Sequence, residues 1–205
     1  MSVPLVYVSL DAFKSSLSMD GFSFIDSDAT QALSAASRAV DAICDRQFYV
    51  HDLSNDETRY YTPLRPGVLD IDDMVGFTSL KTDQDGDGVF ETTWTLHTDF
   101  EFQPDNADLG GRPWERVVLK QRTMSMFPVG VPRSVELVGS FGWLTVPDQV
   151  VTLTSILAAR LLQRVRMAPM GVIGLGVDGA TRIAREDPDV CTLVRDLTRA
   201  PIFVG

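Results

Sequence analysis

The stretch Asp83-Gln84-Asp85-Gly86-Asp87-Gly88-Val89-Phe90-Glu91 decides how the middle of this chain folds. Its alternating aspartates and its first glycines match the opening half of an EF-hand calcium loop, in which the aspartates take ligand positions one, three and five. The twelfth position, which requires a bidentate glutamate, is Trp94, and the residues after Glu91 alternate as in a strand. The stretch therefore predicts a turn between two strands and not an EF-hand.

The same carboxylates leave two interpretations open. In the first, Asp83, Asp85, Asp87 and Glu91 hold a calcium ion in the turn, with a backbone carbonyl as a further ligand. In the second, the aspartates and glycines serve only the geometry of a solvated hairpin tip. Structural calcium is the one cofactor that the sequence suggests.

On both sides of this turn, from Phe48 to about Phe141, β-branched and aromatic residues alternate with polar ones between turn signals. We expect strands at Thr58–Thr62, Val75–Thr82, Phe90–Leu96, Phe100–Gln103, Glu115–Lys120 and Ser134–Phe141. The acidic pair Asp72-Asp73 is assigned to a turn. Because the connections are short, the strands are expected to be antiparallel.

Helical periodicity occupies both ends of the chain. We expect helices at Val8–Leu17 with Ser9 as the N-cap, at Asp28–Arg46 with Asp26 or Ser27 as the N-cap, at Asp148–Met167, and from Asp187-Pro188 onward. The Asp148–Met167 helix is apolar on more than one side, so it should be covered by more than one neighbour. The apolar stripe on this helix consists of Val150, Leu153, Leu157, Leu161 and Val165.

The predicted fold class is α+β, with a helical bundle of N- and C-terminal helices and an inserted antiparallel β region. We expect residues 1–48 to form the N-terminal helical part and residues 49–146 the β insertion. Residues 147–205 form the C-terminal helices and tail. The two terminal parts should pack as one helical domain.

The charge of the chain is unevenly distributed around a net value of −10. Residues 1–149 carry 11 basic and 23 acidic side chains, whereas residues 150–205 carry 7 arginines and 5 acidic side chains. An acidic body disfavours binding to a phosphate backbone and is compatible with a surface that DNA passes without sticking. No secretory signal or membrane-spanning run is evident. Cys44 and Cys191 are expected to be reduced thiols.

Catalytic patterns are sparse, and the sequence predicts no enzyme. The two histidines, His51 and His97, have no patterned partner, and the glycine-rich segment 171–179 fails both phosphate-loop templates. The arginines of the last third form the one basic region. Arg160 and Arg164 lie four residues apart on one helix face, where we expect them to form ion pairs with the acidic body of a neighbouring subunit.

Several segments together resemble the head–tail connector proteins of tailed bacteriophages. Val8–Lys14 is similar to an opening V-[ST]-L-x-x-[LF]-K pattern, and Phe141–Trp143 followed by Val146-Pro147 is similar to a G-W…V-P junction before a long helix. The other segments that carry the resemblance are Ile43–Phe48, Leu69–Val75, Asp83–Thr95, Arg182-Ile183 and Asp187–Val190. They occur in the same order over most of the chain.

The resemblance implies a structural subunit of the phage neck, located in the virion at the head–tail interface and made in the cytoplasm of the host bacterium. Such proteins form a ring, commonly of twelve subunits, beneath the portal protein. The ring extends the DNA channel without sequence-specific binding and offers a platform to the next neck or tail-completion protein. In this family the C-terminal segment reaches the portal, which here points to Ile202, Phe203 and Val204 as portal-binding residues.

Overall fold

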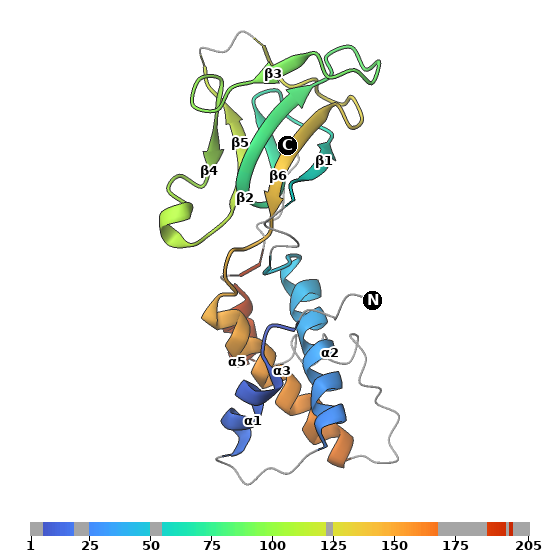
Figure 1. The fold of residues 1–205 in the computed structure, drawn as a ribbon, viewed down its shortest axis with the longest axis vertical. Helices are drawn as coiled ribbons and strands as arrows, with labels where there is room; N and C mark the ends of the chain where they lie inside the picture. Colours follow the sequence, from blue (N-terminus) through green and yellow to red (C-terminus); the bar gives the residue numbers. More distant parts are fainter. Residues whose placement is uncertain are drawn as a thin grey trace. The chain divides into compact units, whose positions relative to one another are not determined.

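The computed structural model describes residues 6–18, 25–49, 55–121, 125–167, 188–195 and 197–198. These residues form an α+β fold with four helices and an antiparallel sheet of six strands (Figure 1). The chain divides into two compact units, one formed by Met1–Phe48 with Val146–Ala200 and the other containing Tyr49–Thr145. The predicted α+β class with an antiparallel β region is thereby confirmed.

The helices are α1 (Leu10–Ser18), α2 (Asp26–Cys44), α3 (Asp148–Met167) and α5 (Pro188–Arg195). The strands are β1 (Glu57–Tyr61), β2 (Val68–Thr82), β3 (Thr92–Trp94), β4 (Phe100–Gln103), β5 (Trp114–Leu119) and β6 (Val135–Phe141). A short 3-10 turn, η1, spans Asp108–Gly110. Within the described ranges, none of the helices is both long and apolar enough to cross a membrane.

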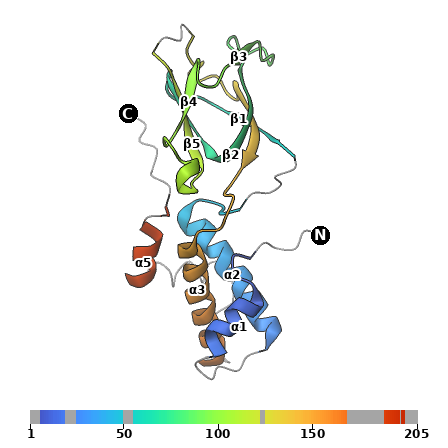
Figure 2. The ribbon, with the colours of Figure 1, turned by 60° about the vertical axis from the view of Figure 1, so that its left-hand side comes forward.

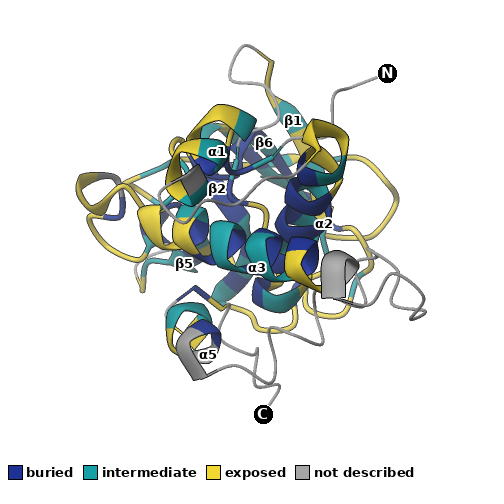
Figure 3. Ribbon diagram, turned by 90° about the horizontal axis from the view of Figure 1, so that it is seen from below, coloured by how far each residue is buried: buried dark blue, intermediate teal, exposed yellow. Residues whose placement is uncertain are grey.

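In the helical unit, α2 packs along α3, α1 packs on α2, and α5 packs on α3 (Figures 2 and 3). The apolar stripe of α3 is buried at Val150, Leu153, Leu157 and Leu161. On α2, Ala32, Ala36 and Ala39 have no exposed surface, and such small side chains let a neighbouring helix approach closely. Two helices therefore cover α3, as its broad apolar surface requires.

The starts of the first two helices show one correct and one wrong prediction. Ser9 caps α1, because its Oγ accepts a hydrogen bond from the backbone N–H of Ala12 at 3.2 Å. Helix α2 begins earlier than predicted, and Ile25 is its N-cap with no side-chain hydrogen bond. Asp26 therefore lies inside the first turn together with Asp28, where both carboxylates complement the positive end of the helix dipole.

The sheet is built around the long strand β2, which pairs with β3, β5 and β6. The strand order is β1-β6-β2-β5-β4, with β3 on β2 in addition, and every pair is antiparallel. Side chains of every strand but β1 are buried in one core, and Tyr61 of the edge strand β1 packs against it. Its fully or nearly fully buried members include Leu69, Ile71, Met74, Leu80, Phe100, Val117, Val135 and Leu137.

The prediction that Asp72-Asp73 forms a turn is wrong, because β2 begins at Val68 and both residues lie within it. Apolar and acidic residues alternate at this end of the strand, so Ile71 is buried while Asp72 is partly exposed. Asp72 accepts a hydrogen bond from Arg59 at 2.9 Å. Asp73 is buried and accepts a 2.8 Å hydrogen bond from the Nε1–H group of Trp143. These partners allow two acidic residues to occupy a central strand.

Candidate functional site

The acidic loop Asp83–Glu91 connects β2 to β3, and Thr82 and Thr92 are paired at its base. The N–H group of Asp83 donates a 2.9 Å hydrogen bond to the carbonyl of Ser134, which ties the loop to the segment before β6. Gly86 and Gly88 have φ angles of 82° and 91°. Because that left-handed region favours glycine, these two residues let the chain reverse without strain.

Asp83 is the organising residue of the loop. Its side chain is 4% exposed, and its two carboxylate oxygens accept hydrogen bonds from the N–H groups of Gly86 at 2.7 Å and Gly88 at 2.8 Å. Desolvation acts to raise the pKa of Asp83, but the hydrogen bonds from Gly88, Gly86 and Asp85 outweigh it and hold the pKa below its usual range. Asp83 is therefore a buried carboxylate that stays ionised.

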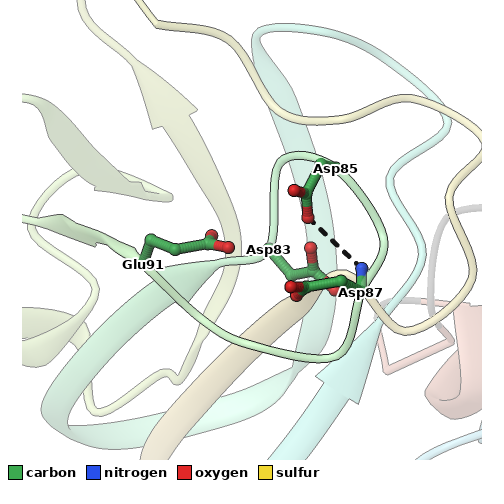
Figure 4. A group of neighbouring side chains, drawn as sticks. All are labelled: Asp83, Asp85, Asp87 and Glu91. Carbon is green, nitrogen blue, oxygen red and sulfur yellow. Dashed lines mark hydrogen bonds between the residues drawn. The ribbon is translucent and has the colours of Figure 1, made fainter.

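Asp85, Asp87 and Glu91 are exposed and lie around Asp83 (Figure 4). One carboxylate oxygen from each of the four residues lies within 4.8 Å of the others. The N–H group of Asp87 donates to Asp85 Oδ1 at 3.3 Å, and Asp87 Oδ1 accepts from the N–H group of Val89 at 2.8 Å. The structure thus brings together all four residues that the sequence singled out.

Four negative charges in such a small volume repel one another, which raises the question of what balances them. Within the described part of the chain, no Lys or Arg side chain forms an ion pair with any of the four carboxylates. Oxygen ligands grouped in this way fit a hard divalent cation such as Ca²⁺. The loop nevertheless differs from an EF-hand, because the residue in the twelfth position, Trp94, is 4% exposed and donates to Thr82 Oγ1 at 2.9 Å.

The other residues predicted from the sequence are placed as follows. Arg160 is half-buried and already makes an interaction within this chain, whereas Arg164 is exposed on the same helix. Ile202, Phe203 and Val204 lie outside the described residues, as do His51 and the glycine-rich segment 171–179.

Cys44 is a free, buried thiol, and burial raises its pKa to about 12. A thiol that remains protonated at neutral pH is a poor nucleophile and a poor metal ligand. This state agrees with the expected role of Cys44 as a reduced core residue. The side chain of Cys191 is not among those described.

A second group of polar residues lies beside β4 and was not found from the sequence. Glu101 is held between Lys120 Nζ, 2.7 Å from its Oε1, and His97 Nδ1, 2.8 Å from its Oε2. The hydrogen bonds from Lys120 and His97 lower the pKa of Glu101. These residues come from β4, the turn before it and the position just after β5, which no local sequence pattern connects.

The Glu101 group borders a hollow of about 580 Å³, a size typical of small-molecule sites. The residues that line it are Leu96, His97, Glu101, Phe102, Asp105, Asn106 and Trp114. The ring of Trp114 stacks on Phe102 with a centroid separation of 4.8 Å and an interplanar angle of 16°. The hollow therefore has an aromatic wall and a polar rim.

No protein-family model and no curated protein sequence matches this chain. Two solved structures contain chains of the same fold. One is the neck of an empty GTA particle computed with C6 symmetry, with 18% identity, a TM-score of 0.56, and coverage of 100% of this chain and 97% of that chain. The other is the virion of a native gene transfer agent (GTA) particle, with 16% identity, a TM-score of 0.54, and coverage of 100% and 96%. The resemblance to neck proteins is thus confirmed at the level of the fold.

Proposed function

We propose that this chain is a structural subunit of the neck of a tailed-phage-like particle, where copies of it form an adaptor ring beneath the portal. The observation that carries this proposal is the full-length fold similarity to chains from a neck and a virion. A match that covers both chains almost completely includes the β region as well as the helices. The ring would extend the DNA channel and link the capsid to the tail.

Charge and symmetry support the same role. The excess of acidic side chains gives a surface that repels the phosphate backbone, as the wall of a DNA passage should. Twelve subunits are compatible with sixfold symmetry, which is the symmetry used for the similar neck structure. We propose a ring of twelve, packed through the helical bundle, with Arg160 and Arg164 on the side of the neighbouring subunit. The role is structural and requires no catalytic residues.

Within this proposal, Ile202, Phe203 and Val204 bind the portal, and the opposite side of the ring receives the next neck or tail-completion protein. Negative-stain microscopy of the purified protein, alone and mixed with portal, tests the ring. We expect annular particles with a mass of twelve 22.6 kDa chains. Deletion of residues 200–205 should weaken portal attachment and leave the circular dichroism spectrum unchanged. A protein that remains monomeric with portal present would refute the ring.

A structural calcium ion in the acidic loop is a separate proposal. It is favoured by the convergence of Asp83, Asp85, Asp87 and Glu91 and by the lack of an ion pair to them within the described ranges. The ion would offset two of the four negative charges and hold the tip of the β2–β3 hairpin in one conformation. It would stabilise the neck subunit and supply no chemistry. Calorimetry with calcium tests it.

A further inference from the structure

The hollow beside β4 has the chemical character of a binding site, and it contains none of the residues proposed above for ring assembly or calcium binding. Strands β4 and β5 lie side by side (Figures 1 and 2). Both strands contribute residues to the wall of the hollow. Phe102 on β4 is 6% exposed, and Trp114 on β5 is partly buried against the core. The aromatic pair is therefore held rigidly, with part of Trp114 open to the hollow.

The rim of the hollow presents polar side chains that form no hydrogen bond or ion pair with the described residues. Asp105 and Asn106 are exposed, and neither side chain has a hydrogen-bond or ion-pair partner there. Their loop is ordered by Ala107, whose carbonyl accepts hydrogen bonds from the N–H groups of Gly110 at 3.0 Å and Arg112 at 2.9 Å. The carboxylate of Asp105, which accepts hydrogen bonds, and the amide of Asn106, which both donates and accepts them, therefore lie beside the aromatic wall.

The backbone at the rim is also unusual. His97 and Asn106 have φ angles of 65° and 57°, and they are two of the four non-glycine residues with positive φ among those described. Lys120 Nζ donates to the carbonyl of His97, and the N–H group of His97 donates to the carbonyl of Phe100 at 3.0 Å. Residues held in this region of φ by surrounding contacts are frequent at binding sites, because the conformation orients the side chain.

The charges around the hollow decide the class of ligand. Lys120 is paired with Glu101, so neither of these two charges is free to bind an ionic ligand. The unpaired carboxylate of Asp105 discourages an anion. What remains is a set of hydrogen-bond donors and acceptors beside a flat apolar surface. This combination suits a neutral ring that carries hydroxyl groups on its edge and C–H groups on its face.

We propose that this hollow binds a hexose unit of a glycan. The apolar face of the sugar ring packs on Trp114, and its hydroxyl groups donate to Asp105 and exchange hydrogen bonds with Asn106. In the neutral tautomer of His97 that donates its Nδ1–H to Glu101, Nε2 is an acceptor for a third hydroxyl group. Because the contacts are few, the dissociation constant for a single sugar should be on the order of 1 mM.

Saturation-transfer difference NMR tests the proposal, because it detects weak ligands of a protein in any assembly state. The probes are methyl β-glucopyranoside, methyl β-galactopyranoside and N-acetylglucosamine, each at about ten times the expected constant. We expect transfer to at least one sugar, strongest at its ring C–H protons. Asp105→Ala and Asn106→Ala should each weaken binding by roughly tenfold, which is the effect of losing one hydrogen bond to a charged or amide group. Both side chains are exposed, and because Asn106 has a φ angle of 57°, Asn106→Gly is tested beside Asn106→Ala to separate backbone strain from the loss of the amide.

Asp85→Ala is the matched control, since it removes an exposed aspartate from another part of the same unit and should leave sugar binding unchanged. Methylguanidinium and inorganic phosphate are tested in parallel as a cationic and an anionic probe. Absence of transfer to all three sugars would overturn the proposal. Binding that persists in both Asp105→Ala and Asn106→Ala, or that is confined to one of the charged probes, would also overturn it.

Discussion

Asp83 satisfies two demands that ordinarily conflict, because its carboxylate is both buried and charged. Burial of an ionised group without partners is very unfavourable. Here the N–H groups of Gly86 and Gly88 point at its two oxygens, and the positive φ angles of these glycines make that arrangement accessible. The turn therefore has its own internal stabilisation, which accounts for Asp83 without a metal. Calcium would act chiefly through the exposed carboxylates.

The lowered pKa of Asp83 predicts how the β unit responds to acid. A carboxyl group whose folded pKa is depressed contributes stability that is fully present above its unfolded pKa of about 4 and is lost as pH falls through the folded pKa. Asp83→Asn removes this titration, so the variant should be less stable at neutral pH and should lose less stability below about pH 4.

Urea unfolding followed by tryptophan fluorescence measures this effect directly. All three tryptophans, Trp94, Trp114 and Trp143, belong to the β unit, so their emission reports its unfolding and not that of the helices. Asp105→Asn serves as the control, because that exposed carboxylate accepts no hydrogen bond among the described residues. An Asp83→Asn protein that keeps the full acid sensitivity of the parent would show that another group is responsible.

Calcium should bind the loop and raise the unfolding midpoint of the same unit. Isothermal titration calorimetry is expected to show one site, and calcium at a hundred times its dissociation constant should add about 2.7 kcal/mol to the free energy of unfolding. Asp85→Asn and Asp87→Asn should each weaken binding by about tenfold or more, because the number of charged ligands sets the affinity. Asp105→Asn should bind calcium normally. The absence of any heat with the parent protein would leave the loop as a plain turn.

The amino-acid sequence identifies the carboxylates of this loop but not their surroundings. The Asp-x-Asp-x-Asp-Gly spacing is local, so it can be recognised from the order of residues alone. The contact between Asp83 and Ser134 joins residues far apart in the chain, and nothing in the spacing indicates it. The hollow beside β4 shows more clearly that the order of residues does not reveal which distant side chains meet. Glu101, Asn106, Trp114 and Lys120 come from separate segments, and only the pairing of β4 with β5 brings them together.

Among the elements, sequence patterns predict α3 correctly to the residue and β2 only in part. The start of α3 is marked by Pro147 and Asp148, and the apolar residues that it buries recur with the 3.6-residue period of a helix. The first half of β2 is missed because Asp70, Asp72 and Asp73 give it a polar composition that is unfavourable in strands. Tertiary partners override that preference. Arg116, for example, donates to Asp70 Oδ1 at 2.7 Å from the neighbouring strand.

The pairing of β2 with β6 depends on one close backbone approach. Gly139 lies opposite Phe77 in a part of the pair where the register shifts. A Cβ atom added at Gly139 would lie 2.1 Å from the carbonyl oxygen of Gly76 and 2.6 Å from Met74 Cε. A backbone oxygen cannot move aside as a flexible side chain can, so only glycine fits this position.

Gly139→Ala should therefore destabilise the β unit by about 3 kcal/mol or more, at the upper end of the usual cost of overpacking. Gly67→Ala is the control, because a Cβ atom there meets nothing within 4 Å and the φ angle does not demand glycine. That variant should be neutral or slightly stabilised by the reduced entropy of the unfolded chain. Urea midpoints from tryptophan fluorescence compare the two. Equal midpoints would contradict the close approach of β2 and β6.

At the scale of the whole molecule, the uneven charge predicts that ring assembly depends on salt. The C-terminal third has more arginines than acidic residues, whereas the rest of the chain is strongly acidic. Like copies placed head to side around a ring would bring these opposite charges together at every interface. Such attraction between exposed groups is screened at high ionic strength. The proposed ring should therefore loosen as salt is added.

Arg164 is the residue best suited to test this interface. It is exposed near the end of α3 and forms no ion pair with a described acidic side chain, so its replacement should leave the helical unit folded. Arg164→Glu turns an attractive contact into a repulsive one at each interface. Because a single exposed ion pair contributes up to about 1 kcal/mol, reversal should cost about twice that per interface. Repeated around a closed ring, this cost should shift the protein to smaller species at low protein concentration.

Gln163→Glu is the matched control, since it introduces the same negative charge at the adjacent exposed position of α3 but removes no arginine. Light scattering coupled to size-exclusion chromatography measures the mass of both variants across a salt series. We expect the parent and Gln163→Glu to dissociate at similar, higher salt concentrations and Arg164→Glu to be dissociated already at low salt. If Arg164→Glu assembles as the parent does at every salt concentration, Arg164 lies outside the interface, and the acidic body meets its neighbour through other residues.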